Sequence, residues 1–267
     1  MEKLLIYIVS YQRKSYTQGT IECISKVKPI NSQIIVCDNG STDGTREWLK
    51  DNQEKYGLGL IFPEENLRVP RAWNLLTNYY GENDFNYILP LDNDCWLLPD
   101  KEWFNKCLEI FNSDSSIGSL GIHNERKPGT FVFEEQKDPN YDLRKPFNNK
   151  IKYYDTVLYA GARLDKFSLW HQTMSNWSHK FIGDKIGRSY NSQGYRTVKI
   201  TPGFIVDISE TNFNNENHQE YNQWFFERER DGKNGSAYNK KYSKSYGKTQ
   251  THDFVTENFG KEFIKFL

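Results

Sequence analysis

YILPLDND, residues 87–94, joins a short apolar run to two carboxylates that stand one residue apart. The run predicts a buried strand over residues 87–91. At the end of a strand, side chains at i and i+2 point the same way, so Asp92 and Asp94 would face a single bound cation. Hard oxygen ligands suit Mg²⁺ or Mn²⁺ rather than zinc. Most isolated Asp-x-Asp pairs are solvated turns, so the surrounding sequence decides between the two interpretations.

The sequence around this stretch alternates apolar runs with helical patterns. The apolar runs predict strands at residues 3–9, 33–37, 58–62, 87–91 and 117–123. The helical patterns between them cover residues 15–27, 42–55, 69–80 and 99–111. Continuous apolar strands that alternate with helices are typical of a parallel sheet covered on both faces. We therefore expect an α/β fold: a single Rossmann-type domain with a mostly parallel central sheet flanked by helices.

The pattern weakens after residue 123. Residues 124–150 are charged, contain proline and have little periodicity, which predicts a long loop or lid. Shorter elements follow, with an ordered segment at 153–159, a helix-like segment at 164–174, strands at 197–200 and 204–208, and a helix at 216–230. Residues 231–251 are rich in Lys, Tyr, Ser, Gly and Asn and predict a flexible segment. An amphipathic helix is expected at 254–266.

Composition excludes several classes of protein. The 267 residues carry 35 basic and 35 acidic side chains, so no overall field draws the chain to nucleic acid or anionic lipid. The mean hydropathy of −0.80 is polar, but an aromatic content of 15% argues against disorder. No apolar run approaches the roughly 18 residues of a membrane-spanning helix, and the apolar start is too short for a signal peptide. The four cysteines lack CxxC spacing, which predicts reduced thiols and a cytoplasmic protein.

The loop after the first strand argues against two nucleotide-binding classes. It reads Ser10-Tyr11-Gln12-Arg13, and no glycine follows until Gly19. A dinucleotide-binding fold needs glycines there so that the backbone can approach a pyrophosphate. A sugar-1-phosphate nucleotidyltransferase, which shares the layered architecture, also needs a glycine-rich loop at this point. No P-loop motif occurs in the sequence.

The second strand ends in a polar turn, Asp38-Asn39-Gly40-Ser41-Thr42-Asp43-Gly44-Thr45. One interpretation is that its Asp and Ser side chains merely cap the next helix. The other interpretation places Asp38 at the carboxyl end of a parallel strand, where α/β sheets bind ligands. A carboxylate there can accept hydrogen bonds from a nucleobase edge or a ribose.

Four segments stand in order along the first 100 residues. They are residues 6–13 (IYIVSYQR), residues 38–45 (DNGSTDGT), Glu65-Asn66-Leu67 with Asn74 eight positions beyond Asn66, and residues 91–94 (LDND). Together they resemble the signature of family 2 glycosyltransferases of GT-A fold. The resemblance implies a metal-dependent, inverting transfer of a sugar from a nucleotide-diphosphate sugar, with a UDP-sugar favoured, to an acceptor hydroxyl.

The resemblance also implies roles for individual residues. Ser10 and Asp38 would lie near the nucleoside, and Asp92 with Asp94 would form the acidic motif that holds Mn²⁺ or Mg²⁺ against the diphosphate. The family usually has glycine where Arg68 stands, so Arg68 offers a cation to the diphosphate or lies at a solvated helix start, and Arg71 has the same two interpretations. The full set of implied donor contacts is Ser10, Tyr11, Arg13, Asp38, Asn66, Arg68, Arg71, Asn74, Asp92 and Asn93.

The second half of the chain resembles the family more loosely. Asp184 is the implied general base, although glycine stands at position 183, where the family has the first acid of a pair. Counting on from Gly194 places Asp207 where the family has a metal-ligating histidine. His218 is the competing third ligand, with an exposed position near a helix start as its alternative.

These matches divide the chain into a donor-binding half (1–123), an acceptor and catalytic-base half of the same domain (124–232), and a basic segment with a C-terminal helix (233–267). Lysines and tyrosines alternate over residues 233–250, which form a solvated segment or a docking patch for an anionic membrane surface or nucleic acid. A carbohydrate, a lipid-linked glycan and a nucleic acid remain open as acceptors. Processive members of the family carry a Gln-x-x-Arg-Trp motif that this sequence lacks, so we expect non-processive transfer. A non-catalytic nucleotide-sugar-binding protein is the rival from another class.

Overall fold

The computed structural model describes residues 2–123, 145–146, 152–155, 162–178, 185–201, 203–208 and 248–267. The strands are β1 (Leu4–Ser10), β2 (Ser32–Asp38), β3 (Leu58–Ile61), β4 (Tyr87–Asp92), β5 (Cys95–Leu97), β6 (Ile117–Gly121), β7 (Lys145–Pro146), β8 (Lys152–Asp155), β9 (Arg163–Lys166), β10 (Arg196–Thr201) and β11 (Ile205–Asp207). The helices are α1 (Lys14–Val27), α2 (Thr45–Asp51), α3 (Gln53–Tyr56), α4 (Arg68–Leu75), α5 (Trp103–Ser113), α6 (Phe167–Ser175), α7 (Lys185–Ser192) and α10 (Lys248–Phe259), with 3₁₀ helices η1 (Leu76–Asn78) and η5 (Lys261–Phe266).

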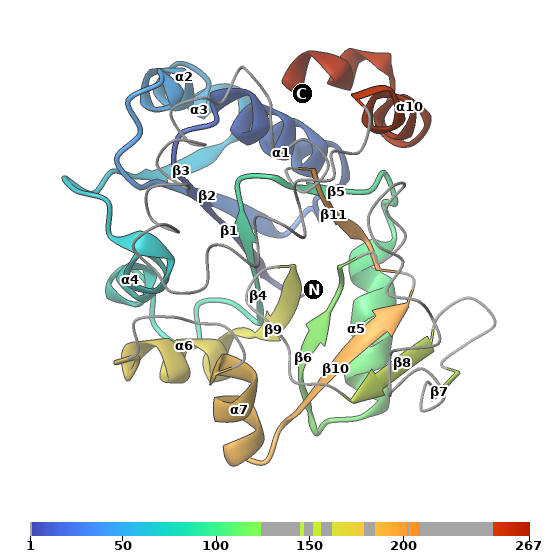
Figure 1. Cartoon of the computed structure of the whole chain (residues 1–267). Coiled ribbons are helices and arrows are strands. Elements are labelled where there is room, and N and C mark those ends of the chain that lie inside the picture. Colours follow the sequence, from blue (N-terminus) through green and yellow to red (C-terminus); the bar gives the residue numbers. More distant parts are fainter. Residues whose placement is uncertain are drawn as a thin grey trace, which may run out of the picture.

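The main sheet has the order β3-β2-β1-β4-β9-β6-β10-β8-β7, and β11 pairs with β5 in a second, two-stranded sheet. Strands β3, β2, β1 and β4 pair in parallel. Strand β9 is antiparallel to both of its neighbours, β4 and β6, so β6 and its parallel partner β10 run in the same direction as β4. The predicted mostly parallel α/β sheet is confirmed (Figure 1).

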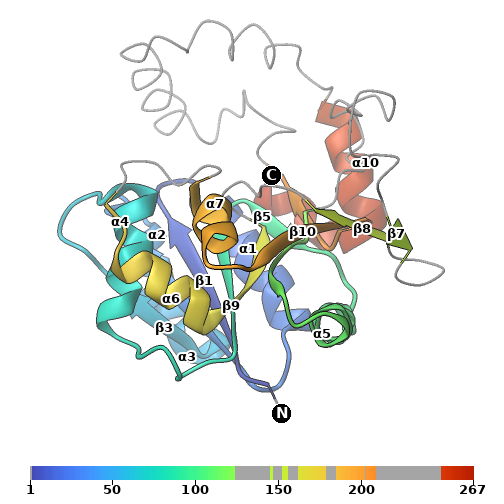
Figure 2. The ribbon, with the colours of Figure 1, turned by 90° about the horizontal axis from the view of Figure 1, so that it is seen from below.

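The two faces of the sheet bury alternate residues of the same strands, as side-chain alternation requires. On one face, Leu4, Ile6 and Ile8 join a core cluster with residues of α1 and α5. On the other face, Leu5 and Tyr7 join residues of α4, α6 and α7. Figures 1 and 2 show α4, α6 and α7 grouped together and apart from α5. The sheet is therefore the middle layer of three.

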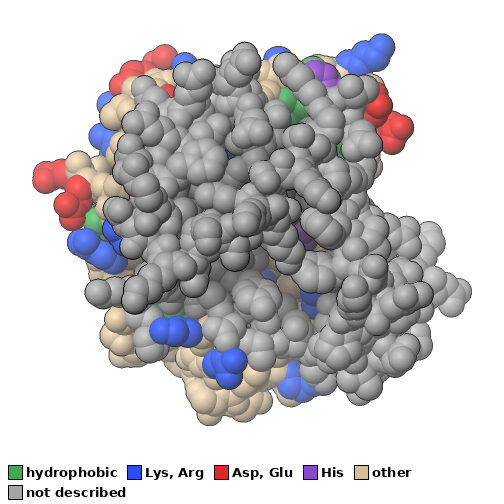
Figure 3. Space-filling model, viewed as in Figure 1, with side chains coloured by type: hydrophobic (Ala, Val, Ile, Leu, Met, Phe, Trp, Pro, Cys, Tyr) green, Lys and Arg blue, Asp and Glu red, His purple; other side chains and the backbone are tan. Residues whose placement is uncertain are grey.

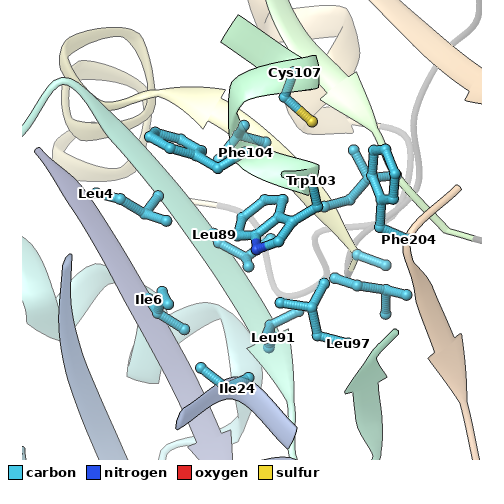
Figure 4. Packing of buried hydrophobic residues seen from close by; sticks show 14 of the residues in the cluster. Leu4, Ile6, Ile24, Leu89, Leu91, Leu97, Trp103, Phe104, Cys107 and Phe204 are labelled. Atoms are coloured by element: carbon cyan, nitrogen blue, oxygen red, sulfur yellow. The ribbon is translucent and has the colours of Figure 1, made fainter. Parts of the chain in front are cut away.

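Trp103, at the start of α5, fills the centre of the first face. Its side chain is fully buried, and Figure 4 shows it among Leu89, Leu91 and Leu97. The indole N–H donates to the backbone carbonyl of Val27 over 3.1 Å. The hydrogen bond pairs the only polar atom of the ring, so the ring can be buried with its full apolar area.

A third core cluster joins the end of the chain to α1 and the small sheet. Trp96 of β5 is fully buried, and its ring meets Phe259, Phe263 and Phe266 with edge-to-face geometry at centroid distances of 5.3, 5.6 and 6.3 Å. Gly19 of α1 permits this packing, because a Cβ atom there would lie 2.4 Å from the Trp96 ring. The segment from α10 to η5 is thus part of the folded core.

Two expected helices are interrupted. The helix expected over residues 42–55 is divided into α2 and α3 at Asn52, whose backbone is not helical (φ −112°, ψ 8°). The Asn52 side chain donates to the Trp48 carbonyl over 2.9 Å, and the same carbonyl accepts from the Asn52 N–H over 3.1 Å. The helix expected over residues 254–266 begins earlier, at Lys248, and is broken at Gly260, where φ is +100°.

The largest correction concerns residues 164–174, which were expected to be helix-like throughout. The chain instead forms β9 first and becomes helical only from Phe167. The short strand β5 was not expected at all. The predicted helix at 216–230 and most of the predicted loop at 124–150 lie outside the described residues. None of the helices described has the length and hydropathy that crossing a bilayer requires.

Candidate active site at the carboxyl edge of the sheet

Three predicted site residues end neighbouring strands. Ser10, the last residue of β1, pairs with Asp38, the last residue of β2, and Val9 pairs with Asp92, the last residue of β4. The structure therefore brings Ser10, Asp38 and Asp92 together at one edge of the sheet. The carboxyl edge of a parallel sheet is the usual ligand-binding edge of α/β folds.

The loop after β1 forms hydrogen bonds with the residues that follow β2 and with those that follow β4. Gln12 and Arg13 both have left-handed backbones, with φ of 54° and 58°, and such conformations are uncommon for residues other than glycine. The Gln12 N–H donates to Ser41 Oγ over 2.8 Å, and its side-chain amide donates to Thr42 Oγ1 over 2.9 Å. Its carbonyl oxygen accepts from the Asn93 amide over 2.9 Å. This conformation could not be foreseen, since nothing in the residue types marks it.

The Arg13 side chain contacts two residues of the acidic motif, Asn93 and Asp94. Its Nη1 donates to Asp94 Oδ2 and its Nη2 to Asn93 Oδ1, both over 2.8 Å. The side chains of Arg13 and Asp94 are each 7% exposed. The Asn93 amide also donates to Thr17 Oγ1 over 3.1 Å, so Asn93 serves inside the protein as the link between this motif and α1. Part of the acidic charge is thus already balanced by the chain itself.

Asp92 is in a different position from Asp94. Among the described residues, its carboxylate has no hydrogen bond and no ion pair. Burial, followed by the nearby charge of Asp94, raises the pKa of Asp92 to about 6, and the opposing effects of Arg13 and Arg163 are smaller. A half-buried carboxylate that lacks a partner and lies next to a second acid would be stabilised by a bound cation. The oxygen-only chemistry of this pair fits Mg²⁺ or Mn²⁺.

Asp38 is fully buried, and both of its carboxylate oxygens have protein partners. Oδ1 accepts from the Ser41 N–H over 3.2 Å, and Oδ2 accepts from Nε of Arg46 over 2.9 Å. Arg46 stands in the first turn of α2 and was not foreseen as a site residue. An arginine at a helix start is ordinarily solvated, and only the tertiary contact with Asp38 distinguishes this one.

The segment after β3 is held to the edge by a pair of asparagines. The Asn39 amide donates to Asn66 Oδ1 over 3.0 Å, and the Leu67 N–H donates to Asn39 Oδ1 over 2.8 Å. Arg68 then opens α4 with a left-handed backbone (φ 60°) and an exposed side chain. The pair Asn39–Asn66 therefore fixes the position from which Arg68 extends.

The remaining predicted donor residues lie further along or beside this segment. Arg71 is 70% exposed and pairs with Glu65 over 3.6 Å, as expected of a solvated side chain. The Asn74 amide donates to the backbone carbonyl of Met174 and so joins α4 to α6. Tyr11 is half-buried in the loop after β1.

The structure places the backbone of one predicted third metal ligand beside the acidic motif. Asp207 pairs with Cys95 across the small sheet, and the N–H of Ile208 donates to the Asp94 carbonyl over 2.9 Å. Asp184 and His218 lie outside the described residues. The main chain next to Asp207 therefore reaches the acidic pair, and the position of Asp207 supports it as a candidate third ligand.

A buried polar network lies under the site. Asp165 of β9 accepts from Nε of Arg163 over 2.7 Å, from the Tyr190 hydroxyl over 2.9 Å, and from the hydroxyl of Ser119. All four side chains are fully buried, and the Arg163 guanidinium lies 5.0 Å from the ring centroid of Trp73. The network joins β6, β9, α4 and α7. Sequence reasoning missed it because charged residues ordinarily indicate a solvated surface.

The strand order and the acidic strand ends define a GT-A domain, the fold of a large class of glycosyltransferases. The chain belongs to the family Glycosyl transferase family 2, whose sequence model it matches over residues 5–171. It is 27% identical to glycosyltransferase GlyA of Streptococcus pneumoniae over 175 residues, which is 63% of this chain and 23% of that protein. It is 29% identical to the uncharacterized glycosyltransferase MG025 of Mycoplasma genitalium over 143 residues, which is 49% of this chain and 45% of that protein. The chain thus matches less than half the length of either relative.

Solved structures show the same fold. The mannosyltransferase PcManGT from Pyrobaculum calidifontis, in complex with GDP-Man and Mn²⁺, has a TM-score of 0.62 at 13% identity, covering 99% of this chain and 72% of that one. S. aureus TarS 1–349 in complex with UDP-GlcNAc has a TM-score of 0.56 at 12% identity, covering 76% of this chain and 58% of that one. At such identities the likeness establishes the fold alone.

Proposed function

We propose that this chain is a metal-dependent, inverting glycosyltransferase that moves one sugar from a nucleotide-diphosphate sugar to an acceptor hydroxyl. The observation that carries the proposal is the meeting of Ser10, Asp38 and Asp92 at the carboxyl edge of the sheet. The spread of these residues over three strand ends suits an elongated ligand. The nucleoside lies at the Ser10–Asp38 end, and the diphosphate lies at Asp92.

The leaving diphosphate gains negative charge as the bond to the sugar breaks, and that charge must be offset. Mn²⁺ or Mg²⁺, when bound, supplies this Lewis-acid stabilisation. Asp92 would hold the ion, with Asp94 and Asp207 as the further carboxylates. The carboxylate of Asp92, which has no partner among the described residues, supports this assignment, and the ion pair from Arg13 makes Asp94 the weaker ligand. Arg68, exposed at the start of α4, would offer a further cation to the diphosphate.

The acceptor hydroxyl must lose its proton as it attacks the anomeric carbon. Asp184, which directly precedes the first residue of α7, is the proposed general base. Such a group typically contributes about 10²–10⁴-fold to the rate. Attack opposite the leaving diphosphate in a single displacement inverts the anomeric centre.

The donor is a UDP-sugar in the first instance. The structure of TarS with UDP-GlcNAc supports this choice, whereas PcManGT was solved with GDP-Man, so a GDP-sugar is the second candidate. The acceptor is a carbohydrate or a lipid-linked glycan. On the face in Figure 3, the described acidic side chains lie at the upper and left edges and basic ones at several places along the rim. A nucleic-acid acceptor would need clustered basic side chains, and the basic residues 233–247 that suggest one lie outside the described residues.

A thermal-shift panel of nucleoside diphosphates and their sugars, with and without Mn²⁺, tests the proposal. A ligand present at about 100 times its Kd stabilises the folded state by about 2.7 kcal/mol. We expect at least one diphosphate to raise the melting temperature, and to raise it further with Mn²⁺. Transfer or hydrolysis of the matching sugar then separates the enzyme from a non-catalytic binding protein. If no diphosphate shifts the melting temperature, the proposal is wrong.

A further inference from the structure

Arg46 lies at the proposed nucleoside end and has hydrogen-bond donors to offer. Asp38, the residue expected to contact the base, has no exposed surface, and Ser41 and Arg46 engage its two carboxylate oxygens. Arg46, which contacts Asp38, is 28% exposed, so its guanidinium is a group that a ligand at this edge can reach.

The guanidinium of Arg46 is held by groups on two strand ends. Its Nε donates to Asp38 Oδ2, and its Nη2 donates to the backbone carbonyls of Asp38 over 3.3 Å and of Pro63 over 3.2 Å. The guanidinium carbon also lies 4.9 Å from the ring centroid of Phe62. Asp38 ends β2, and Phe62 and Pro63 directly follow β3. The group is thus fixed at the carboxyl edge, and little side-chain entropy remains to be lost when a ligand binds.

The chemistry of this group restricts its ligand. A guanidinium has five N–H donors and no acceptor. Among the described residues, Nη1 of Arg46 makes no hydrogen bond. A fixed donor with no acceptor beside it suits a base edge that presents oxygen, such as the carbonyls of uracil or the O6 and N7 atoms of guanine. If the base turns its C4 (pyrimidine) or C6 (purine) substituent toward Arg46, the amino groups of cytosine and adenine would instead place N–H against N–H.

We propose that Arg46 reads the base of the donor and that Asp38 acts as its anchor, so that the site selects uridine or guanosine diphosphates over those of cytidine and adenosine. The inference rests on the proposed function, because it assumes that a nucleoside diphosphate lies at this edge. It goes further by naming the class of base and the residue that determines it. Arg46 is then a specificity-determining residue, and Asp38 is a positioning residue.

Binding of UDP, GDP, CDP and ADP to the whole chain, measured by calorimetry with Mn²⁺ present, tests the inference. The wild-type protein is expected to bind UDP or GDP at least about tenfold more tightly than CDP and ADP, the discrimination that a good base contact supplies. In Arg46→Ala this preference falls to within about threefold. Arg46→Lys keeps the charge but loses the planar fork, and it provides a second variant if the alanine variant does not fold.

Lys50→Ala is the matched control. Lys50 lies one turn further along α2, and its ammonium group is 5.4 Å from the same Phe62 ring. Lys50 makes no hydrogen bond or ion pair with Asp38, so its loss should leave the base preference unchanged.

Two results would overturn the inference alone: a wild-type protein that binds CDP or ADP as tightly as UDP and GDP, or Arg46 variants that keep the preference. If the Arg46 variants keep the preference for UDP and GDP and Asp38→Asn loses it, Asp38 rather than Arg46 determines the base. Failure of all four diphosphates to bind the wild-type protein would instead reject the proposed function, and the inference with it.

Discussion

Arg13 neutralises Asp94 in a buried ion pair: Nη1 of Arg13 lies 2.8 Å from Asp94 Oδ2, and each side chain is 7% exposed. The same guanidinium holds Asn93. The chain therefore supplies its own cation to the acidic motif, at the place where a metal ion and a diphosphate are proposed to bind. This relationship determines how the motif responds to substitution.

Arg13→Gln leaves the Asp94 carboxylate buried without its partner. Removal of one member of a buried pair typically destabilises the folded state by about 3–5 kcal/mol. We expect a lower midpoint of urea unfolding without metal, and a larger stabilisation by Mn²⁺ than in the wild-type protein, because the ion then replaces the lost charge. Arg71→Ala, which removes an exposed pair, should change the free energy of unfolding by less than about 1 kcal/mol. Equal Mn²⁺ effects in Arg13→Gln and wild type would contradict the expectation.

The raised pKa of Asp92 predicts a pH dependence of stability. The pKa rises from 3.8 to about 6 on folding, chiefly through burial. Between these two values the folded state binds more protons than the unfolded state, so the contribution of Asp92 to stability falls as the pH rises through this window. Asp92→Asn should remove this contribution to the slope of the free energy of unfolding against pH. The variant should therefore melt at a higher temperature than the wild-type protein, and the difference should be larger at pH 7.5 than at pH 4.

A bound cation favours the ionised form of Asp92. The shift in melting temperature caused by Mn²⁺ should therefore be larger at pH 7.5 than at pH 5 in the wild-type protein. In Asp92→Asn the shift should be small at both values. An Mn²⁺ effect that is unchanged in this variant would assign the ion to other residues.

Asp184→Asn tests the proposed base separately from donor binding. We expect transfer to fall by about 10²-fold or more, while the thermal shift caused by the donor diphosphate stays within error of wild type. Asp94→Ala should reduce both quantities, because it alters the acidic motif. Transfer that persists within about threefold in Asp184→Asn would remove Asp184 from the mechanism.

Tyr190→Phe tests the buried network under the site. Burial, and then the charge of Asp165, raise the pKa of Tyr190 well above its usual value, so its hydroxyl stays protonated and donates to Asp165. Its loss leaves a buried carboxylate with one donor fewer, at a cost of about 1–3 kcal/mol in the free energy of unfolding. Tyr195→Phe is the matched control, because the Tyr195 hydroxyl makes no hydrogen bond within the described residues. Equal effects of the two substitutions would show that the Tyr190 hydroxyl contributes no stability.

The sequence predicted the sheet well because its strands are continuous apolar runs that only a covered sheet can bury. β1 and β4 begin and end within one residue of expectation. β9 was missed for the opposite reason: Arg163 and Asp165 are charged, yet both are fully buried because each balances the other. A local pattern cannot show a pairing that depends on Ser119 and Tyr190 from distant parts of the chain.

The same limit applies to the site. Asp38 and Asp92 were placed correctly at the edge of the sheet, because a residue that ends a parallel strand must lie there. The partners of Asp38 and Asp94 were not foreseen. Arg46 reaches Asp38 across one loop, but Arg13 reaches Asp94 across 81 positions of sequence. Which carboxylate keeps a partner and which is left for a ligand is decided by tertiary contacts alone.

Trp96 lies next to the acidic motif in the sequence, but the residues that pack on its ring are made last. It stands two residues after Asp94, and the phenylalanines that cover it lie at positions 259, 263 and 266. On the ribosome, the strands that carry Ser10 and Asp38 emerge long before this cover exists. The Trp96 ring therefore lacks these three neighbours until residues 259–266 have been made, so this part of the core is completed long after the strands that carry Ser10 and Asp38.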